Sequence, residues 1–497
     1  MEKLHERIAL TTAILAASVL STSARSAPRE PFRLPDDAGI RDRLRAYVDD
    51  AKAAPGVVVG VLEDGRRRFV AYGRSGIPGH PELDRATYFE IGSITKVFTG
   101  QLLADAVERG EVRIDDPIGG LFPPEIRLAV DRAAITLEDL ATHHSGLPRI
   151  ALDLGPLLRG VMSRDPYAGS TADELFRSVA KVPGRFLGVR GRFSYSNLGM
   201  AVLGQLLARR AGRSFEGLLR ERVLRPMELD DIVVGQADPR SHAVARGHLE
   251  NLRPAAAWHL DAYAPAGALS ATAEQMLAFS ARALAGDPPA LREAERSRRP
   301  AGDSAGSSIG LGWLHRSVKD RDVIWHNGGT GGFRTFLAIV PEERCGLVVL
   351  TNGMGDADSL ALALLDPALP SPRSRRPRWG AVALTLSAMA MPSLVLAGFI
   401  RRRRRPRGPV PPLDRLGLAA TLATSAIVLL AAARWGAWAD LPFALGWASV
   451  AVGSVIGIAA CWEARHLAWC EPAAKPRLRW RVLGLALRAG ALLFLAT

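Results

Sequence analysis

Cysteine is scarce in this chain, with three residues among 497. Cys461 and Cys470 lie in a strongly apolar C-terminal part, which leaves Cys345 alone in the rest of the sequence. A single cysteine has no intramolecular partner, so a disulfide framework is excluded there. The stability of that larger part must therefore come from a hydrophobic core.

Patterns typical of metal, phosphate and nucleic-acid binding are also missing. His143 and His144 are adjacent without partners at ligand spacing, and His248 is not followed by a second histidine at the zincin spacing. The net charge of +14 and the pI near 10.4 come in good part from arginines beside apolar C-terminal stretches, which indicates contact with anionic lipid. We expect no metal, no cofactor and no nucleic-acid partner.

The N-terminus has the pattern of a secretory signal. Charged Lys3 and Arg7 precede an apolar run from Ile8 to Leu20, and small residues follow up to Ala24. Residues 1–24 are predicted to be a signal peptide, which implies export of the domain that follows. An uncleaved anchor is the alternative, although the run is short for a spanning helix.

The sequence changes character after about Pro370. A linker rich in proline and arginine at residues 369–378 is followed by a region, 379–497, that is predicted to hold three to four transmembrane helices. A buried soluble hairpin is the less favoured alternative. The four apolar stretches are Trp379–Ile400, Leu416–Ala433, Leu441–Trp462 and Val482–Thr497, of which the second is near the lower length limit and the last is the shortest.

Arginine placement predicts the orientation of these helices. The loop after the first stretch carries Arg401 to Arg405, and the loop after the third carries Lys475 and several arginines. By the positive-inside rule both loops are cytoplasmic. We expect a multi-pass protein of the cell membrane with its catalytic domain on the extracytoplasmic side. The arginines of the linker argue weakly for the opposite orientation.

The most informative motif is Ser93-Ile94-Thr95-Lys96, at the turn into a long apolar helix. A serine hydroxyl needs a base within hydrogen-bond reach to act as a nucleophile. Residues three apart share one face of a helix, so Lys96 can reach back to Ser93. The lysine must be neutral to accept a proton, which requires burial or nearby positive charge.

Two further motifs follow far downstream, Tyr195-Ser196-Asn197 and His326-Asn327-Gly328. The patterns of the first and third motifs each occur a second time in the chain, at Ser178-Val179-Ala180-Lys181 and His144-Ser145-Gly146. Order and context separate them, because only Ser93 opens a long apolar helix with the tyrosine and then a glycine-rich strand far downstream.

With these motifs the chain resembles the serine β-lactamase and penicillin-binding-protein superfamily. The similarity is to the branch related to class C β-lactamases, which also holds D-peptidases and esterases. It runs roughly from Arg41 to Asn352. Beyond the motifs it includes the segments Ile135–Pro148, Phe193–Gly199 and His326–Phe333.

The resemblance implies three catalytic residues. Ser93 would be the acylated nucleophile and Lys96 its base partner. Tyr195 would carry the proton between Ser93 and the leaving group, provided that neighbouring cations lower its pKa. The alternative for Tyr195 is a core aromatic residue whose hydroxyl group is satisfied.

The resemblance also implies substrate-binding and oxyanion residues. Asn197 would orient Lys96 and hold a substrate amide carbonyl, with a helix cap as the alternative. The glycine-rich strand with Gly328 and Gly329 would help to form the oxyanion hole, through the backbone N–H groups of Ser93 and Gly329. His326 stands where many β-lactamases have lysine, and its charge would be only partial. This departure favours peptidase or esterase chemistry, with Arg334 as a possible substitute for the missing cation.

The predicted fold is α+β, an antiparallel sheet flanked by helices with a mostly helical second lobe, in a domain covering residues 30–368. The strands that begin and end this domain would join in one sheet, and the site would lie between the lobes. The second lobe would extend from about Ile114 to Leu284. Expected strands are Gly56–Leu62 and Arg68–Gly73, a hairpin around Asp64-Gly65, then Trp313–His315, Val323–His326, Phe333–Val340 and Leu347–Asn352, with helices at Arg41–Lys52 and Ala357–Leu365 covering the sheet.

The sequence thus predicts a membrane-anchored serine hydrolase that acts through an acyl-enzyme on an extracytoplasmic amide or ester. The substrate would be a small molecule or peptide with D-amino acid or β-lactam character, and the other partner would be membrane lipid. An esterase of the same family remains open, because pocket shape sets the acyl group accepted. A membrane β-lactam sensor acylated at Ser93 and an inactive scaffold are the rivals outside the enzyme class.

Overall fold

The computed structural model describes residues 32–77, 79, 82–151, 165, 167–302, 306–370, 382–390 and 415–435. The chain divides into two units, Met1–Leu34 and Pro35–Thr497, and the elements below belong to the second. The predicted signal peptide and the third and fourth apolar stretches lie outside the described residues, as does most of the predicted linker.

The prediction that the strands beginning and ending the domain at residues 30–368 join in one sheet is confirmed. Strand β1 (Gly56–Glu63) pairs antiparallel with β11 (Cys345–Thr351) inside an eight-stranded sheet. Both strands consist mostly of valine, leucine and glycine, and all of their residues except Glu63 are buried. The sheet order is β2 (Arg66–Gly73), β1, β11, β10 (Arg334–Val340), β9 (Arg321–Gly329), β8 (Leu314–Val318), β7 (Ser308–Ile309) and β6 (Arg299–Pro300).

The β1–β2 hairpin turns at the two residues that the sequence indicates. Asp64 and Gly65 both have positive φ, +47° and +81°, between the paired residues Glu63 and Arg66. Two consecutive residues of this kind give the turn whose twist matches that of the flanking strands. An aspartate followed by glycine is a favoured sequence for it, because glycine has no steric penalty at positive φ.

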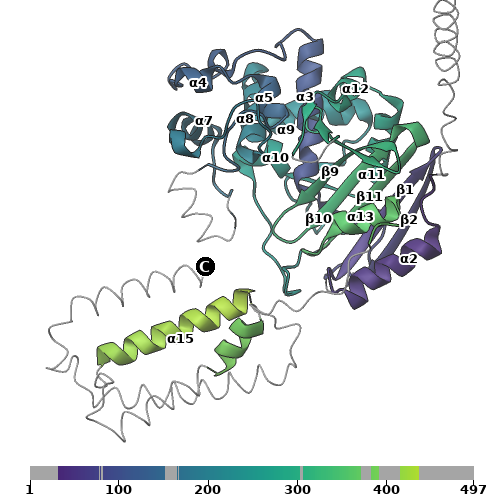
Figure 1. Ribbon diagram of the computed structural model, residues 1–497, viewed down its shortest axis with the longest axis vertical. Helices are drawn as coiled ribbons and strands as arrows, with labels where there is room; N and C mark the ends of the chain where they lie inside the picture. Colours follow the sequence, from purple (N-terminus) through teal and green to yellow (C-terminus); the bar gives the residue numbers. More distant parts are fainter. Residues whose placement is uncertain are drawn as a thin grey trace, which may run out of the picture. The chain divides into compact units, whose positions relative to one another are not determined.

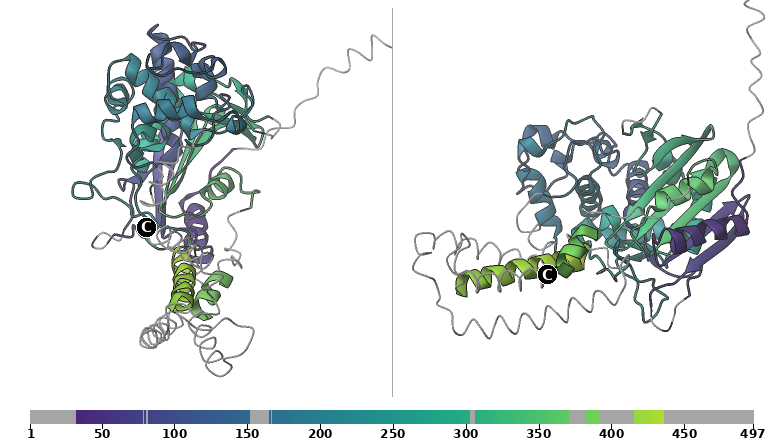
Figure 2. Two further views of the ribbon diagram at one scale, coloured as in Figure 1. Left: turned by 90° about the vertical axis from the view of Figure 1, so that its left-hand side faces the viewer. Right: turned by 60° about the horizontal axis from the view of Figure 1, so that its bottom comes forward.

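Helices cover both faces of the sheet (Figures 1 and 2). Helix α2 (Asp37–Arg45), continued by a π-helical turn at Ala46–Asp50, lies on the same face as α13 (Ala357–Leu365). Helix α11 (Ala273–Ala285) packs on the opposite face, against β1 and β11. The expected second lobe, from about Ile114 to Leu284, includes nearly all of α11, and for this helix the expectation is wrong. The reason lies in β1, where a Cβ atom at Gly60 would lie 3.0 Å from Leu277 of α11, so that glycine allows the helix to pack closely on the sheet.

The second lobe is mostly helical, as predicted, and Figure 1 shows its helices gathered at one end of the sheet. It also contains a small three-stranded sheet that the sequence did not suggest, in the order β3 (Phe89–Glu90), β5 (Leu269–Ala271), β4 (Val233–Val234). The helices outside the sheet layers are α3 (Thr95–Glu108), α4 (Val130–Ala133), α5 (Leu137–Ala141), α7 (Ala172–Lys181), α8 (Asn197–Arg210), α9 (Phe215–Leu219), α10 (Ala264–Gly267) and α12 (Pro289–Glu295).

Helix α3 is held inside the core. Its residues from Thr95 to Ala104 are all buried, so the helix has no solvent face along most of its length. Phe98 stacks on Phe279 of α11 with ring centroids 4.3 Å apart, and Phe279 stacks in turn on Trp313 at 5.9 Å. These three stacked rings join α3 to the layer that covers the sheet. They therefore fix the position of α3, and Ser93 lies just before the start of this helix.

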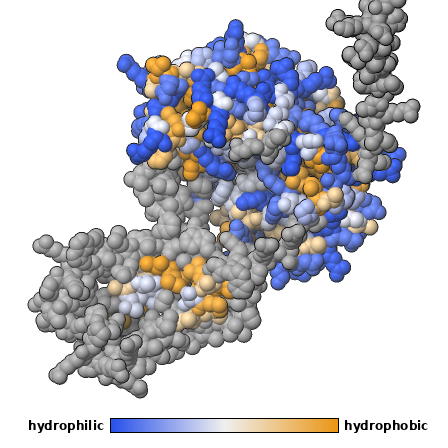
Figure 3. All heavy atoms as spheres, viewed as in Figure 1, coloured by the Kyte–Doolittle hydropathy of each residue, from blue (hydrophilic) through white to orange (hydrophobic). Residues whose placement is uncertain are grey.

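The C-terminal part contributes helix α15 (Arg415–Trp435), which coincides with the second predicted apolar stretch, and a helical segment at residues 382–390 inside the first. Among the described residues, no helix combines the length and the hydropathy needed to cross a membrane. Figure 3 shows mostly polar residues on the visible face of the part that holds the eight-stranded sheet and several apolar residues on the visible side of α15.

Candidate active site

Ser93 occupies the middle of a 3₁₀ turn, η2 (Gly92–Ile94), between β3 and α3. Gly92 has a φ of +55°, and a Cβ atom there would lie 2.6 Å from the backbone nitrogen of Gly329. Glycine at position 92 therefore lets the turn and the end of β9 approach closely. The Thr95 hydroxyl fixes the turn, because it donates to Gly92 O (2.7 Å) and accepts from Leu269 N (3.0 Å).

Lys96 lies against Ser93 in the interior. Its side chain is fully buried, and Nζ is 2.9 Å from Ser93 Oγ while donating to Ala266 O at 2.6 Å. Burial lowers the pKa of Lys96 well below its ordinary value, and the positive charge of Arg149 lowers it further. A neutral amine keeps a lone pair, so Lys96 has the property that a base for Ser93 requires.

Tyr195 lies beside Ser93 and Lys96, but its pKa is raised and not lowered. Burial raises the pKa of Tyr195 to about 12, although a hydrogen bond with Ser93 and the charge of Arg149 act to lower it. The condition that neighbouring cations bring the pKa of Tyr195 down is therefore not met, because burial outweighs the effect of Arg149. Lys96 Nζ lies 5.0 Å from the ring centroid, but a buried lysine that is itself neutral offers little positive charge. Tyr195 is a neutral phenol that can donate a proton.

Asn197 is close to the site but does not contact Lys96. It is the first residue of α8, and its amide donates to the Tyr167 hydroxyl at 3.2 Å. Within the described residues it has no hydrogen bond with Lys96, so the expected orienting contact is not formed. The cap of α8 is Ser196, whose Oγ accepts from Gly199 N at 2.9 Å. The Asn197 Oδ1 atom is buried without a partner among the described residues.

His326 lies on β9 and is fully buried. Burial, with a smaller effect of Lys96, lowers the pKa of His326 to about 3. The partial charge expected from an ordinary histidine is therefore absent. Nδ1 is paired with the carbonyl of Asn327, which leaves Nε2 as the unprotonated ring atom, without a partner in the described part of the chain.

The glycines after His326 let β9 pass close to the nucleophile turn. A Cβ atom at Gly328 would lie 2.0 Å from Ile91 O and 2.2 Å from Thr335 Oγ1. The Thr335 hydroxyl donates to the same carbonyl at 2.9 Å. Gly329, the next residue, is the one whose nitrogen faces Gly92. These contacts bring the end of β9 beside Ser93, where the resemblance implies an oxyanion hole.

Arg149 is a residue of the site that the sequence reading missed. Its guanidinium carbon lies 5.2 Å from the ring centroid of Tyr195, and the residue is exposed. Arg334, the cation considered from sequence, donates instead to Thr330 O and Phe333 O and holds the loop after β9. Arg149 follows a segment that resembles the family, but nothing in the sequence distinguishes it among so many arginines.

The second Ser-x-x-Lys pattern, Ser178 to Lys181, is excluded as a nucleophile and base by where it lies in the fold. Ser178 lies inside α7, where its hydroxyl donates to Leu175 O at 2.7 Å. Lys181 is exposed to solvent. Among the described residues no hydrogen bond joins Ser178 to Lys181, so this pair is not arranged as a nucleophile and its base.

The family model for β-lactamase matches residues 41–368, which is more than half of the chain. The chain belongs to the β-lactamase family. It is 28% identical over 369 residues to a D-alanyl-D-alanine-carboxypeptidase/endopeptidase of Escherichia coli, covering 70% of this chain and 91% of that protein. It is 26% identical over 342 residues to a β-lactamase of the same organism, covering 60% and 84%.

Solved structures show the same fold. A class C β-lactamase from Rhodobacter sphaeroides matches with a TM-score of 0.56 and 22% identity, over 66% of this chain and 97% of that one. The β-lactamase-family protein described here is accordingly a serine hydrolase with an α+β, antiparallel-sheet architecture.

The charge of Arg149 should lower the pH at which this β-lactamase-family protein becomes active, in addition to the larger effect of burial on Lys96. Arg149 lowers the pKa of Lys96, so Arg149→Gln raises it, and the neutral amine then forms only at higher pH. We expect the acidic limb of kcat/KM to move to higher pH. The measurement is the pH profile of p-nitrophenyl acetate hydrolysis, a substrate without a carboxylate.

Arg185→Gln is the matched control, because Arg185 is exposed beside Phe186 and should leave the profile in place. Burial raises the pKa of Glu90 to about 7, so Glu90→Gln identifies any limb that this carboxyl produces. An acidic limb that stays at the same pH in Arg149→Gln would contradict the assignment of Lys96 as the base.

Proposed function

We propose that this protein hydrolyses an amide or ester through an acyl-enzyme formed on Ser93. The observation that carries the proposal is the buried Lys96 amine 2.9 Å from the Ser93 hydroxyl. Lys96 takes the hydroxyl proton as the Ser93 oxygen attacks the substrate carbonyl carbon. The resulting oxyanion accepts hydrogen bonds from the backbone N–H groups of Ser93 and Gly329.

Tyr195 completes the first half of the reaction. When the bond to the leaving group breaks, Tyr195 gives its phenolic proton to that group and recovers a proton from Lys96. The high pKa of Tyr195 supports this order, because the phenol is protonated before attack. Water then attacks the acyl-enzyme, releases the acyl group and restores the Ser93 hydroxyl.

The proposed substrate is a peptide with D-amino acid character or a β-lactam that resembles one. The support is the similarity to a D-alanyl-D-alanine-carboxypeptidase/endopeptidase and to β-lactamases. Such peptides end in a carboxylate, and buried, neutral His326 offers no charge to bind it. The exposed guanidinium of Arg149 beside Tyr195 is the group that we assign to the substrate carboxylate.

Acylation by benzylpenicillin tests the mechanism. We expect the intact mass of the full chain to rise by one benzylpenicillin, with the same adduct on Ser178→Ala and none on Ser93→Ala. Lys96→Ala should slow adduct formation by a factor of about 10² to 10⁴, the usual effect of losing a general base. The measurement is mass spectrometry over time after mixing.

The outcomes also separate the alternatives. An adduct that never hydrolyses favours a β-lactam sensor, and turnover of p-nitrophenyl esters without any penicillin adduct favours an esterase. An adduct on Ser93→Ala as large as on the unchanged protein would sink the proposed nucleophile.

The role of Arg149 has its own test. A peptide ending in D-alanyl-D-alanine with a free carboxylate should be cleaved faster than its C-terminal amide. Arg149→Gln should reduce this preference by about tenfold or more, the effect of one lost hydrogen bond to a charged group. His326→Gln is the control and should keep the preference, since His326 is uncharged. An unchanged preference in Arg149→Gln would refute the assignment.

We also propose that residues 30–368 form the extracytoplasmic hydrolase domain and that residues 369–378 link it to a membrane anchor within 379–497. The four apolar stretches, the arginine-rich loops between them and the signal-like N-terminus support this topology. Alkaline carbonate should leave the full chain in the membrane pellet. External protease should digest the hydrolase domain in spheroplasts. Release of the chain by carbonate would refute the anchor.

A further inference from the structure

His143 lies directly against Tyr195. The sequence gives this residue no role beyond a pair of adjacent histidines that lacks metal-ligand spacing. His143 follows α5 after Thr142, its side chain is completely buried, and its φ is +61°. A left-handed backbone is uncommon for a residue other than glycine and costs free energy. The surrounding contacts must therefore offset this cost.

Three contacts from His143 reach three consecutive residues around Tyr195. Its backbone carbonyl accepts from Ser194 N at 2.8 Å. Its ring packs on the Tyr195 ring with centroids 4.4 Å apart and planes inclined by 46°. Its Nδ1 atom accepts from Ser196 N at 3.3 Å. The backbone on both sides of Tyr195 and the ring itself are thus held by one residue.

The hydrogen bond from Ser196 also fixes the state of the ring. Because Nδ1 accepts an N–H, the proton of the neutral imidazole is on Nε2. Burial, with smaller effects of the neighbouring Lys96 and His326, lowers the pKa of His143 well below its ordinary value, which keeps the ring neutral. Nε2 has no partner among the described residues, so the ring offers an unused donor within the site.

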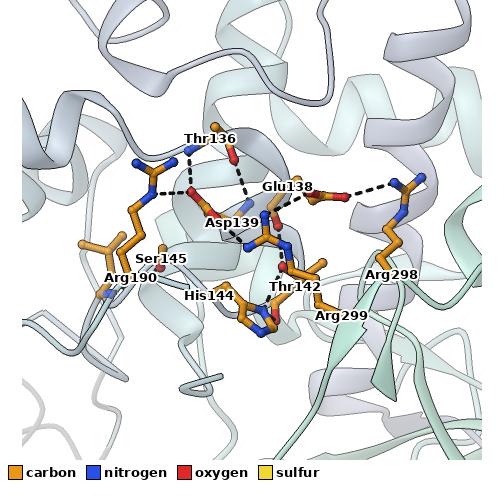
Figure 4. Close-up of polar contacts among 10 residues, drawn as sticks. Thr136, Glu138, Asp139, Thr142, His144, Ser145, Arg190, Arg298 and Arg299 are labelled. Atoms are coloured by element: carbon orange, nitrogen blue, oxygen red, sulfur yellow. Dashed lines mark hydrogen bonds and ion pairs between the residues drawn. The ribbon is translucent and has the colours of Figure 1, made fainter. Parts of the chain in front are cut away.

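The segment that carries His143 is itself fastened to the loop before Tyr195 (Figure 4). Thr136 and Asp139 form a capping box at the start of α5. Asp139, almost fully buried, also accepts from Arg190 Nε at 2.7 Å and from Arg299 Nη1 at 2.8 Å. The backbone of His144 accepts from Gly191 N at 2.8 Å. Residues 139–144 and 190–196 therefore form one joined unit.

We propose that His143 is a positioning residue that holds the Tyr195 phenol at the leaving-group side of Ser93. The proposal deepens the proposed function and rests on the role of Tyr195 in it. His143 does not exchange a proton with the substrate. It keeps the phenol oxygen in line for transfer of its proton by restraining the ring and the backbone on both sides.

The effect of the Tyr195 position on the rate of ester cleavage depends on the leaving group. Ethoxide is a strong base and leaves only when it is protonated, whereas p-nitrophenoxide leaves readily without a proton. A displaced Tyr195 should therefore slow an ethyl ester far more than a p-nitrophenyl ester with the same acyl group. General damage to the fold would slow both esters in proportion.

The experiment uses the full chain and two esters of N-phenylacetylglycine, with ethanol and with p-nitrophenol. For His143→Phe, which keeps an aromatic ring but loses the acceptor, we expect kcat/KM to fall about tenfold or more for the ethyl ester and less than about threefold for the p-nitrophenyl ester. Tyr195→Phe should show the same pattern more strongly. His143→Asn, whose side-chain oxygen can accept from Ser196 N, should recover most of the ethyl ester activity.

His144→Phe is the matched control, since the neighbouring ring bonds to Thr142 O and meets the Tyr195 segment through an edge contact with Phe193, at 5.9 Å between ring centroids, which phenylalanine can keep. It should leave the ratio of the two rates unchanged. Arg190 is half-exposed, and Arg190→Gln removes its ion pair with Asp139, which joins residues 139–144 to residues 190–196. We expect this variant to lose less kcat/KM than His143→Phe, and only for the ethyl ester. This variant keeps the test valid if His143→Phe does not fold, which its thermal unfolding midpoint will show.

Equal losses for both esters in His143→Phe, or no loss for either, would overturn the positioning role while the proposed function stands. Acylation of Ser93→Ala by the p-nitrophenyl ester at the rate of the unchanged protein would overturn the proposed function and the inference with it. A selective loss for the ethyl ester in His143→Phe and Arg190→Gln, but not in His144→Phe, would support both.

Discussion

The amine of Lys96 is held out of water, and the chemistry of the site depends on that burial. Helix α3 places the side chain in the core, where Ala266 O and the Ser93 hydroxyl are its hydrogen-bond partners. An ammonium group there would have to give up its hydration, so the neutral form is favoured. The stacking of Phe98 on Phe279 and the close passage of β9 at Gly328 hold the elements around Lys96 in place.

The same burial changes the charges of the neighbours. His326 and His143 are neutral, and Tyr195 is a protonated phenol. The site is thus a set of uncharged groups that can pass one proton from Ser93 to a leaving group, with Arg149 as the cation beside Tyr195. A base that is neutral and an acid that is protonated before the reaction are the starting states that this proton transfer needs.

Features set by local sequence were predictable. The Asp64-Gly65 turn requires two residues with positive φ, and the Ser93–Lys96 spacing is a property of the helix. The long-range features were not predictable, because they depend on which groups exclude water or meet across the fold. Burial reverses the expected pKa shift of Tyr195, Asn197 bonds to Tyr167 and not to Lys96, and the partners of His143 are some fifty residues away.

The protonation state of Lys96 in the free protein is the most direct test of this account. The chain has six lysines, few enough for nuclear magnetic resonance of protein labelled with ¹³C at the lysine ε-carbon, with Lys96→Arg to assign the signal. We predict one ε-carbon that titrates well below the ordinary lysine pKa of about 10.4 and is absent from Lys96→Arg. If every lysine titrates near the ordinary value, Lys96 is a cation in the resting protein, and the account of Ser93 activation is contradicted.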